Sequence, residues 1–165
     1  MATGLGIRTK RIIFKRKTLD PKLVVKESTL SDAIAVHCQV TEFEPDYIEK
    51  NIADRTKGQS PLILIAFFEQ TPAGYMIAYD EYHDGSLYCW MVGVIPKYRR
   101  HRLFSSLMAF FTEYAKKKGF SKIRIKTRNA RREMLGYLVK NGFDFLQIEP
   151  GPTDLDHRIL CEKKL

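Results

Sequence analysis

The stretch Leu87–Met108, LYCWMVGVIPKYRRHRLFSSLM, constrains the fold more than any other part of the chain. Its first half is apolar and predicts a strand that ends before Pro96, because proline lacks a backbone donor and disfavours helical geometry in the preceding residue. An amphipathic helix follows, and a helix start has unpaired amides and a positive dipole end. Between the two lie the basic residues Lys97, Arg99, Arg100, His101 and Arg102. Strand, basic turn and helix start together predict a phosphate-binding site.

Length and composition limit the class of protein. The 165 residues suit one domain with a substantial core, and 44% apolar with 28% charged residues is typical of a globular chain. No apolar run approaches the ~20 residues of a transmembrane helix, and the N-terminus lacks the apolar core of a signal peptide. We therefore expect a cytoplasmic location and no membrane partner.

The cysteines predict neither a disulfide framework nor a metal centre. Cys38, Cys89 and Cys161 are odd in number and widely spaced, and paired-cysteine spacing of the zinc-binding kind is absent from the sequence. We expect all three to be small buried hydrophobic residues.

Charge is segregated along the chain, whose net charge is +9. Residues 1–26 contain eight Lys or Arg and one acidic residue, a net charge of +7. Residues 27–96 contain three Lys or Arg and eleven acidic residues (−8), and residues 97–132 contain thirteen Lys or Arg and one acidic residue (+12). A uniformly basic chain would indicate nucleic acid first. The division instead favours one anionic ligand and a separate cationic one.

The hydrophobic periodicity divides the chain into a basic N-terminal extension, residues 1–21, and a single domain, residues 22–165. Ile12–Phe14 form either an edge strand or part of a basic arm. A strand from residue 22 leads into a helix capped by a residue near 28–31, with His37 on its core-facing side, and a second helix is expected over 45–55.

The centre and end of the chain predict more strands than helices. Residues 61–68 and 73–79 form a hairpin across the loop EQTP, and the strand of the opening stretch follows. After its helix, which stops at Gly119, the alternating residues 121–127 predict a strand parallel to the one before that helix. A further helix, capped near Asn129, and a final hairpin complete the chain.

Two segments resemble motifs of the GNAT family, the Gcn5-related N-acetyltransferases. VIPKYRRHRLFSSLM, residues 94–108, is similar to the family's V-x-P-x-Y-R followed by R-x-x-G-x-G/A, and NARREMLGYLVKNGF, residues 129–143, resembles its helix that closes in K-x-G-F. The resemblance covers residues 22–165 and includes the order of the predicted elements. It implies an α+β fold with a mixed, mostly antiparallel sheet of about seven strands, splayed between the fourth and fifth, and about four flanking helices.

The resemblance also implies a function and a site. An acetyl group would pass from acetyl-CoA, as cosubstrate, to a primary amine by direct attack. The coenzyme's pantetheine arm would pair with Val92, Gly93 and Val94, where the splay leaves strand groups free. Asn129, in the second motif, is assigned to the same coenzyme site. The pyrophosphate would lie on the turn and helix start, on Arg99, Arg100, His101, Arg102, Leu103, Phe104 and Ser105.

The chain departs from the family pattern in this turn, because Arg102 and Phe104 stand where the motif has glycines. Glycine lets the backbone approach phosphate and adopt unusual geometry without cost. A guanidinium can compensate by binding phosphate itself. Phe104 either turns into the core beside Met108 or narrows the coenzyme site.

The candidate catalytic groups are Tyr137, Glu81 and His83. The family places a tyrosine, which protonates the departing thiolate, one position later on this helix, so Tyr137 is either that acid or a packing residue; Tyr88 and Tyr98 are alternative phenols. A base would come from the turn at 80–84, which contains Glu81 and His83, or from the acids at 42–46. These acids lie within residues 27–96, whose net charge is −8, and this favours a cationic acceptor.

Two other functions remain as alternatives. One is a nucleic-acid-associated protein, in which basic residues contact phosphates while Phe14 and Tyr98 stack on bases. The other is a GNAT-fold binding module without catalysis. The apolar final strands also favour a homodimer.

Overall fold

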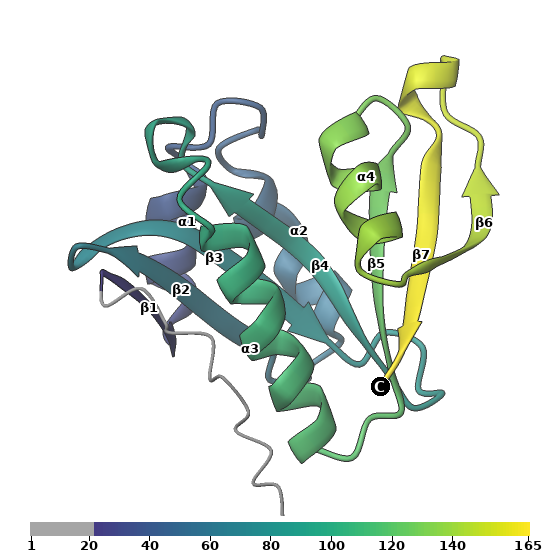
Figure 1. Cartoon of the computed structure of the whole chain (residues 1–165), viewed down its shortest axis with the longest axis horizontal. Coiled ribbons are helices and arrows are strands. Elements are labelled where there is room, and N and C mark those ends of the chain that lie inside the picture. Colours follow the sequence, from purple (N-terminus) through teal and green to yellow (C-terminus); the bar gives the residue numbers. More distant parts are fainter. Residues whose placement is uncertain (1–21) are drawn as a thin grey trace, which may run out of the picture.

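The computed structural model describes residues 22–165, which form a seven-stranded mixed sheet with helices on both faces (Figure 1). The predictions for the extension 1–21, including Ile12–Phe14, lie outside the described residues. The predicted α+β fold and the predicted order of elements are confirmed. In chain order the elements are β1 (Leu23–Glu27), α1 (Leu30–His37), α2 (Tyr47–Thr56), β2 (Leu62–Phe68), β3 (Thr71–Tyr79), β4 (Ser86–Val94), α3 (Leu103–Lys117), β5 (Lys122–Arg128), α4 (Arg132–Lys140), β6 (Asp144–Glu149) and β7 (Arg158–Lys164).

The sheet has the strand order β1-β2-β3-β4-β5-β7-β6, and β4–β5 is its parallel pair. All other neighbours are antiparallel. The parallel pair runs only from Ser86↔Lys122 to Cys89↔Ile125, although β4 continues to Val94 and β5 to Arg128. The two strands therefore diverge at their carboxyl ends, as predicted (Figure 1).

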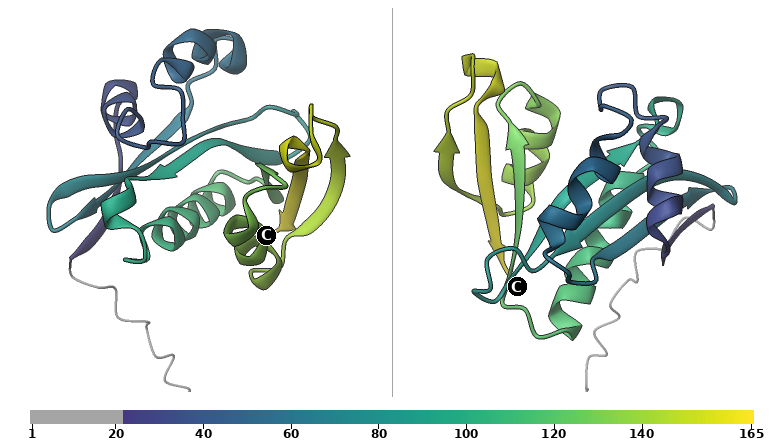
Figure 2. Two further views of the ribbon diagram at one scale, coloured as in Figure 1. Left: turned by 90° about the horizontal axis from the view of Figure 1, so that it is seen from above. Right: turned by 180° about the vertical axis from the view of Figure 1, so that it is seen from behind.

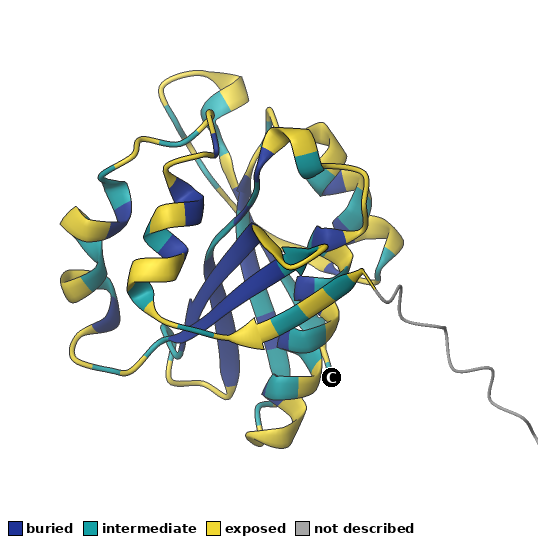
Figure 3. Cartoon of the chain, turned by 90° about the vertical axis from the view of Figure 1, so that its left-hand side faces the viewer, coloured by how far each residue is buried: buried dark blue, intermediate teal, exposed yellow. Residues whose placement is uncertain are grey.

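Two cores hold the sheet between its helices. Residues of α3 and α4, such as Phe111 and Leu138, pack with one face of the sheet, where Ile123 and Ile125 of β5 are buried. Residues of α1 and α2, such as Val36 and Ile48, pack with the opposite face of β2–β4. Seen from above, α1 and α2 cover only the β1–β4 part of their face (Figure 2), and the buried strands lie between the helical layers (Figure 3).

Element ends differ from the predictions in three places. The hairpin between β2 and β3 turns on Glu69 and Gln70 alone, both with positive φ (47° and 70°), because a turn of that geometry matches the twist of the strands better than the four-residue loop predicted. Helix α2 begins at Tyr47, two residues after the predicted start. Helix α4 begins at Arg132, and Asn129 does not cap it.

Two smaller predictions had different outcomes. Thr29, within the predicted range, caps α1 in a capping box with Asp32. Cys89 and Cys161 are buried as predicted, whereas the prediction for Cys38 is wrong, because it follows the last turn of α1 and is exposed. None of the helices within residues 22–165 has the length and apolarity to cross a membrane.

Candidate active site

The carboxyl end of β4 has free backbone groups on one edge. Val92, Gly93 and Val94 keep their partners on β3, but the β5 side is unpaired beyond Cys89. A β-bulge occurs where the pairing stops, because Trp90 is the extra residue between the pairs Ile77↔Met91 and Ala78↔Cys89. Bulges of this kind bend a strand away from its neighbour. An extended ligand chain can pair with the edge that results.

The loop between α1 and α2 closes over Gly93. A Cβ atom on this glycine would lie 2.9 Å from Cε1 of Tyr75 and 3.0 Å from Cε2 of Phe43, so only glycine fits without a shift of its neighbours. The ring of Phe43 stacks on that of His37, with centroids 5.4 Å apart. The loop is thus packed directly onto the strand that carries the free edge.

His37 fixes this loop from beneath. Its ring is fully buried, as predicted for the core face of α1, with Nε2 2.8 Å from the carbonyl oxygen of Glu44 and Nδ1 2.7 Å from the hydroxyl of Tyr75. Because a carbonyl oxygen only accepts, Nε2 carries the proton and the Tyr75 hydroxyl donates to Nδ1. Burial raises the pKa of Tyr75, which keeps that hydroxyl protonated.

The turn after β4 has left-handed backbone at two arginines. Arg100 has φ 69° and Arg102 has φ 61°, a region that costs a residue other than glycine roughly 1–2 kcal/mol. Arg102 occupies the position of a motif glycine, so the turn keeps the glycine geometry without the glycine. An arginine thus adopts a backbone geometry that glycine adopts without cost, and its side chain is an addition to the turn.

Helix α3 begins in this turn with free amides. No side chain among the described residues caps it, and its first backbone hydrogen bond joins the Ser106 N–H to the Arg102 carbonyl oxygen at 3.0 Å. The N–H groups of Leu103, Phe104 and Ser105 precede that bond and have no carbonyl within the helix. Such amides beside a left-handed residue form a concave anion site. We call residues 99–105 the cradle.

Arg99 joins the cradle to the α1–α2 loop. Its guanidinium holds both carboxylate oxygens of Glu42, at 2.7 and 2.8 Å, and its Nε donates to the carbonyl oxygen of Val94 at 3.2 Å. The hydrogen bond from Arg99 lowers the pKa of Glu42 to about 2. The predicted phosphate ligand Arg99 thus already has an anionic partner, and Glu42 is unsuited to accept a proton.

This pair makes stability depend on pH. The pKa of Glu42 is lowered in the folded state, so its contribution is present above the ordinary value near 4.5 and is lost as the pH falls toward about 2. Because both side chains are partly exposed, we expect only about 1 kcal/mol. Urea denaturation of Glu42→Gln should show that loss at pH 7 and a flatter decline between pH 4.5 and 2. An unchanged decline would contradict the assignment.

Phe104 of α3 and Tyr137 of α4 are in contact on the face of the sheet that these two helices cover. Their rings pack edge to face, with centroids 4.8 Å apart and planes at 83°. Phe104 is half-buried against the core, so it turns inward and also narrows the space between α3 and α4. Burial raises the pKa of Tyr137, and a hydrogen bond with Ser105 opposes that rise. Tyr137 is thus a protonated phenol beside the cradle.

Other predicted residues lie elsewhere. Glu81 and His83 are in the β3–β4 turn, at the amino end of β4, which is nine residues long. At about 3.3 Å per residue, that turn is some 25 Å from Val94, and the structure does not bring these two residues to the cradle. The His101 ring packs on Phe68, with centroids 4.5 Å apart.

Asn129 lies across the divergence, at the end of β5. Its side chain donates to the carbonyl oxygen of Asp154 at 2.9 Å, and its N–H donates to that of His157 at 2.7 Å. It therefore anchors the β6–β7 connection. Of the alternative phenols, Tyr88 is buried near the amino end of β4, and Tyr98 packs against Phe68 beside the cradle.

The acidic and basic stretches of the sequence do not fold into one acidic and one basic surface. Glu44 and Asp46 both pair with Lys50. Along β5, basic side chains alternate with buried ones, and each is paired with an acid: Lys122 and Arg124 with Asp84 and Glu162, Lys126 with Glu149, and Arg128 with Asp156. The four cations of β5 are therefore neutralised locally.

The comparisons with known proteins agree with this geometry. The seven-stranded mixed sheet with its parallel β4–β5 pair and four helices matches the fold of acetyltransferases among the solved structures. The sequence matches the acetyltransferase (GNAT) family over residues 30–143, and the chain belongs to that family. No curated protein sequence matches it.

Solved structures share the fold at low sequence identity. The ribosomal-protein-S18-alanine N-acetyltransferase from Escherichia coli is 15% identical, with a TM-score of 0.72 over 86% of this chain and 93% of that one. A GNAT family acetyltransferase from Elizabethkingia anophelis with acetyl-CoA bound is 16% identical, with a TM-score of 0.70 over 88% and 99%. The PaiA N-acetyltransferase from Thermoplasma acidophilum, in complex with coenzyme A, is 18% identical, with a TM-score of 0.63 over 87% and 99%.

Sequence reasoning missed three features of the site: the bulge at Trp90, the contact of Phe43 with Gly93 and the pair Glu42–Arg99. The bulge has no signal in the sequence, because apolar residues surround it on both sides. Gly93 inside a strand was a usable signal, since glycine there often marks the close approach of another group.

Proposed function

We propose that the protein transfers an acetyl group from acetyl-CoA to a primary amine by direct attack. The observation that carries this proposal is the uncapped, left-handed turn at residues 99–105 beside the unpaired edge of Val92–Val94. The coenzyme complexes of the Elizabethkingia and Thermoplasma acetyltransferases support the choice of coenzyme.

The residues of the chain fit this coenzyme. The amides of Leu103, Phe104 and Ser105 can bind the pyrophosphate, and Arg100 and Arg102, both exposed, add positive charge. Backbone groups of Val92–Val94 on the edge without a strand partner, of which the Val94 carbonyl oxygen also accepts from Arg99, can pair with the amides of the pantetheine arm and polarise an adjacent carbonyl oxygen. Acetyl-CoA supplies a thioester carbonyl carbon that a neutral amine can attack. As the C–N bond forms, the C–S bond breaks, and the amine proton passes to solvent.

Tyr137 is our candidate for the acid that protonates the departing thiolate. It contacts both Phe104 and Ser105, so its hydroxyl lies at the cradle, and its raised pKa keeps the proton on it at neutral pH. Glu81 and His83 are too far along β4 for the same step.

Calorimetric titration with acetyl-CoA at low salt tests the proposal. We expect one binding site per chain and an affinity that falls as salt rises, because the cradle holds phosphate by charge. If the protein released no heat with acetyl-CoA at any salt concentration, the proposal would be wrong.

We further propose that two chains associate through β6. This strand is an edge of the sheet, and Phe145, Leu146 and Ile148 are 47%, 49% and 62% exposed. If β6 of a second chain paired antiparallel with this strand, with the two-fold axis between residues 146 and 147, Phe145 would lie opposite Ile148 of the second chain. We expect sedimentation equilibrium to show a dimer that Ile148→Lys converts to monomer. A monomeric parent at the highest concentration would contradict this.

A further inference from the structure

A second candidate site lies at the carboxyl end of β5. A hollow of about 390 Å³ is lined by Arg128, Glu149, Pro150, Gly151, Pro152, Asp156 and Arg158. Three of these residues stand in a row across the sheet, because Arg128 of β5 is in register with Arg158 of β7, which is in register with Glu149 of β6. The hollow is large enough for a small ligand or for one end of a larger one.

The hollow lies across the divergence from the free edge of β4. Arg128 is three residues past the last β4–β5 pair on β5, and Val92 is three residues past it on β4, so both lie beyond the point where the strands part. The face follows from alternation: Ile123, Ile125 and Thr127 are buried toward α3 and α4, and Arg128 therefore points to the face that carries α1 and α2. Among the described elements, no helix covers this face of β5, β7 and β6 (Figure 2).

Charge in the hollow is unbalanced at Arg158. Asp156 accepts from Arg128 at 2.9 Å, and Glu149 pairs with Lys126 at 2.6 Å, so both acids are already engaged. Within residues 22–165, the exposed Arg158 side chain forms no ion pair and no hydrogen bond. Two like charges directly opposite each other on neighbouring strands destabilise a sheet. An anion held between Arg128 and Arg158 would remove that cost.

The wall of the hollow is rigid. A Cβ atom on Gly151 would lie 2.6 Å from the carbonyl oxygen of Asp156, so the loop closes on itself at a residue that must be glycine. The N–H of Gly151 donates to Nδ1 of His157 at 3.0 Å, and Thr153 donates to Asp156 at 2.8 Å. Pro150 and Pro152 fix the backbone on either side. Preorganised walls lower the entropic cost of binding.

We infer that this hollow binds a carboxylate of the acceptor, so that the substrates are amines that also carry an acidic group. The inference rests on the proposed function for the identity of the ligand as acceptor. It differs from the expectation of a purely cationic acceptor, because the acids that suggested one are paired with Arg99 and Lys50 or lie at the far end of β4. A guanidinium binds a carboxylate through two parallel hydrogen bonds.

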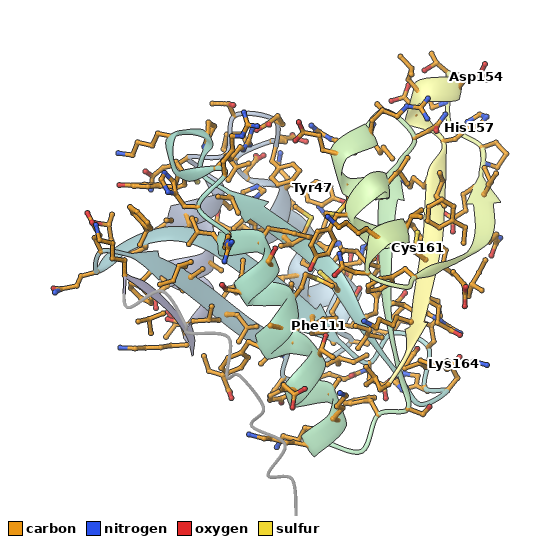
Figure 4. All side chains as sticks on the ribbon, viewed as in Figure 1. Tyr47, Phe111, Asp154, His157, Cys161 and Lys164 are labelled. Carbon is orange, nitrogen blue, oxygen red and sulfur yellow. The ribbon has the colours of Figure 1, made fainter. Side chains whose placement is uncertain are left out.

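Binding to the hollow can be tested without catalysis. Glutarate, a dicarboxylate without an amine, should shift the NMR amide signals of Gly151 and neighbouring residues in the parent. In Arg158→Met we expect the affinity for glutarate to fall at least about tenfold. The matched control is Lys164→Met, which removes a cation from the same face at the other end of β7 (Figure 4 labels Lys164 there and His157 near the hollow). No shift in the parent, or equal shifts in Arg158→Met, would overturn the inference.

The acceptor role needs matched amines. With acetyl-CoA as donor, we expect kcat/KM to be at least about tenfold higher for 4-aminobutyrate than for butylamine. The same difference is expected between the dipeptide Asp-Ala and Ala-Ala amide. The first pair tests small acids and the second tests peptides. Arg158→Met should raise KM for the acidic member and leave butylamine and acetyl-CoA affinity unchanged. Equal losses for both members would overturn the inference. If glutarate binds but acetyl-CoA does not, the proposed function fails while the anion site stands.

Discussion

Ser105→Glu is expected to lower the affinity for acetyl-CoA by at least about 100-fold, which is ~2.7 kcal/mol, while leaving the protein as stable as before or slightly more so. Ser105 is exposed in the first turn of α3, where the amides of the cradle are free. A carboxylate there would compete with the pyrophosphate and repel it. The same carboxylate near a helix start stabilises the helix by about 0.3–1 kcal/mol. Binding and stability should thus change in opposite directions.

Calorimetry and urea denaturation on one preparation would measure both effects of Ser105→Glu. Ala109→Glu is the matched control, because Ala109 is exposed on the same helix one turn further along. We expect that variant to bind acetyl-CoA within about threefold of the parent, since the helix-end effect falls off within the first turn. Equal losses in both variants would show that net charge, and not the cradle, determines affinity.

Gly93→Val is expected to destabilise the protein by about 1–3 kcal/mol, although valine is a better strand residue than glycine. Its Cβ would lie 2.9 Å from the Tyr75 ring and 3.0 Å from the Phe43 ring, both held in place by His37. The new side chain must therefore displace the α1–α2 loop or bend β4. Either change would also disturb the unpaired edge that we assign to the pantetheine arm.

Urea denaturation gives the free energy of unfolding for this comparison. Gly136→Ala serves as the control, because Gly136 lies on the exposed side of α4 and a Cβ there meets nothing within 4 Å. That substitution should stabilise the protein by about 0.5–1 kcal/mol through helix propensity. If Gly93→Val were as stable as the parent, the close packing of the loop onto β4 would be incorrect.

The order of the elements was predictable because hydrophobic period and turn residues agree along most of the chain. Helix α3 has two adjacent apolar rows and ends in lysines before Gly119, and β5 alternates strictly. The ends of elements were less predictable where backbone geometry contradicts residue preference. Glu69 and Gln70 form a turn that usually contains asparagine or glycine, so the sequence indicated a longer loop.

The residues of the candidate site also differ in how far the sequence could predict them. Arg102 and Ser105 could be placed in it because the cradle is continuous in sequence. Glu42 and Arg99 are 57 residues apart, so their pairing depends on tertiary structure that no local pattern encodes. Glu81 was a poor candidate for the opposite reason: it is near β4 in sequence, but the full length of the strand separates it from the cradle. Which end of a strand a residue occupies depends on the direction of the chain through the sheet.

The short pairing between β4 and β5 has a mechanical consequence. Within residues 22–165, backbone pairing between the β1–β4 half of the sheet and the β5–β7–β6 half is limited to the four pairs from Ser86↔Lys122 to Cys89↔Ile125. The two halves of the sheet are therefore hydrogen-bonded to each other at one end only. The cradle lies on the β1–β4 half, and the hollow at Arg158 lies on the β5–β7–β6 half. A small rotation of one half about the paired segment would change the distance between those two sites while breaking few backbone hydrogen bonds. Such a rotation would shear the core that Phe111 and Leu138 share, so this core, and not the backbone pairing, holds the two sites at a fixed distance.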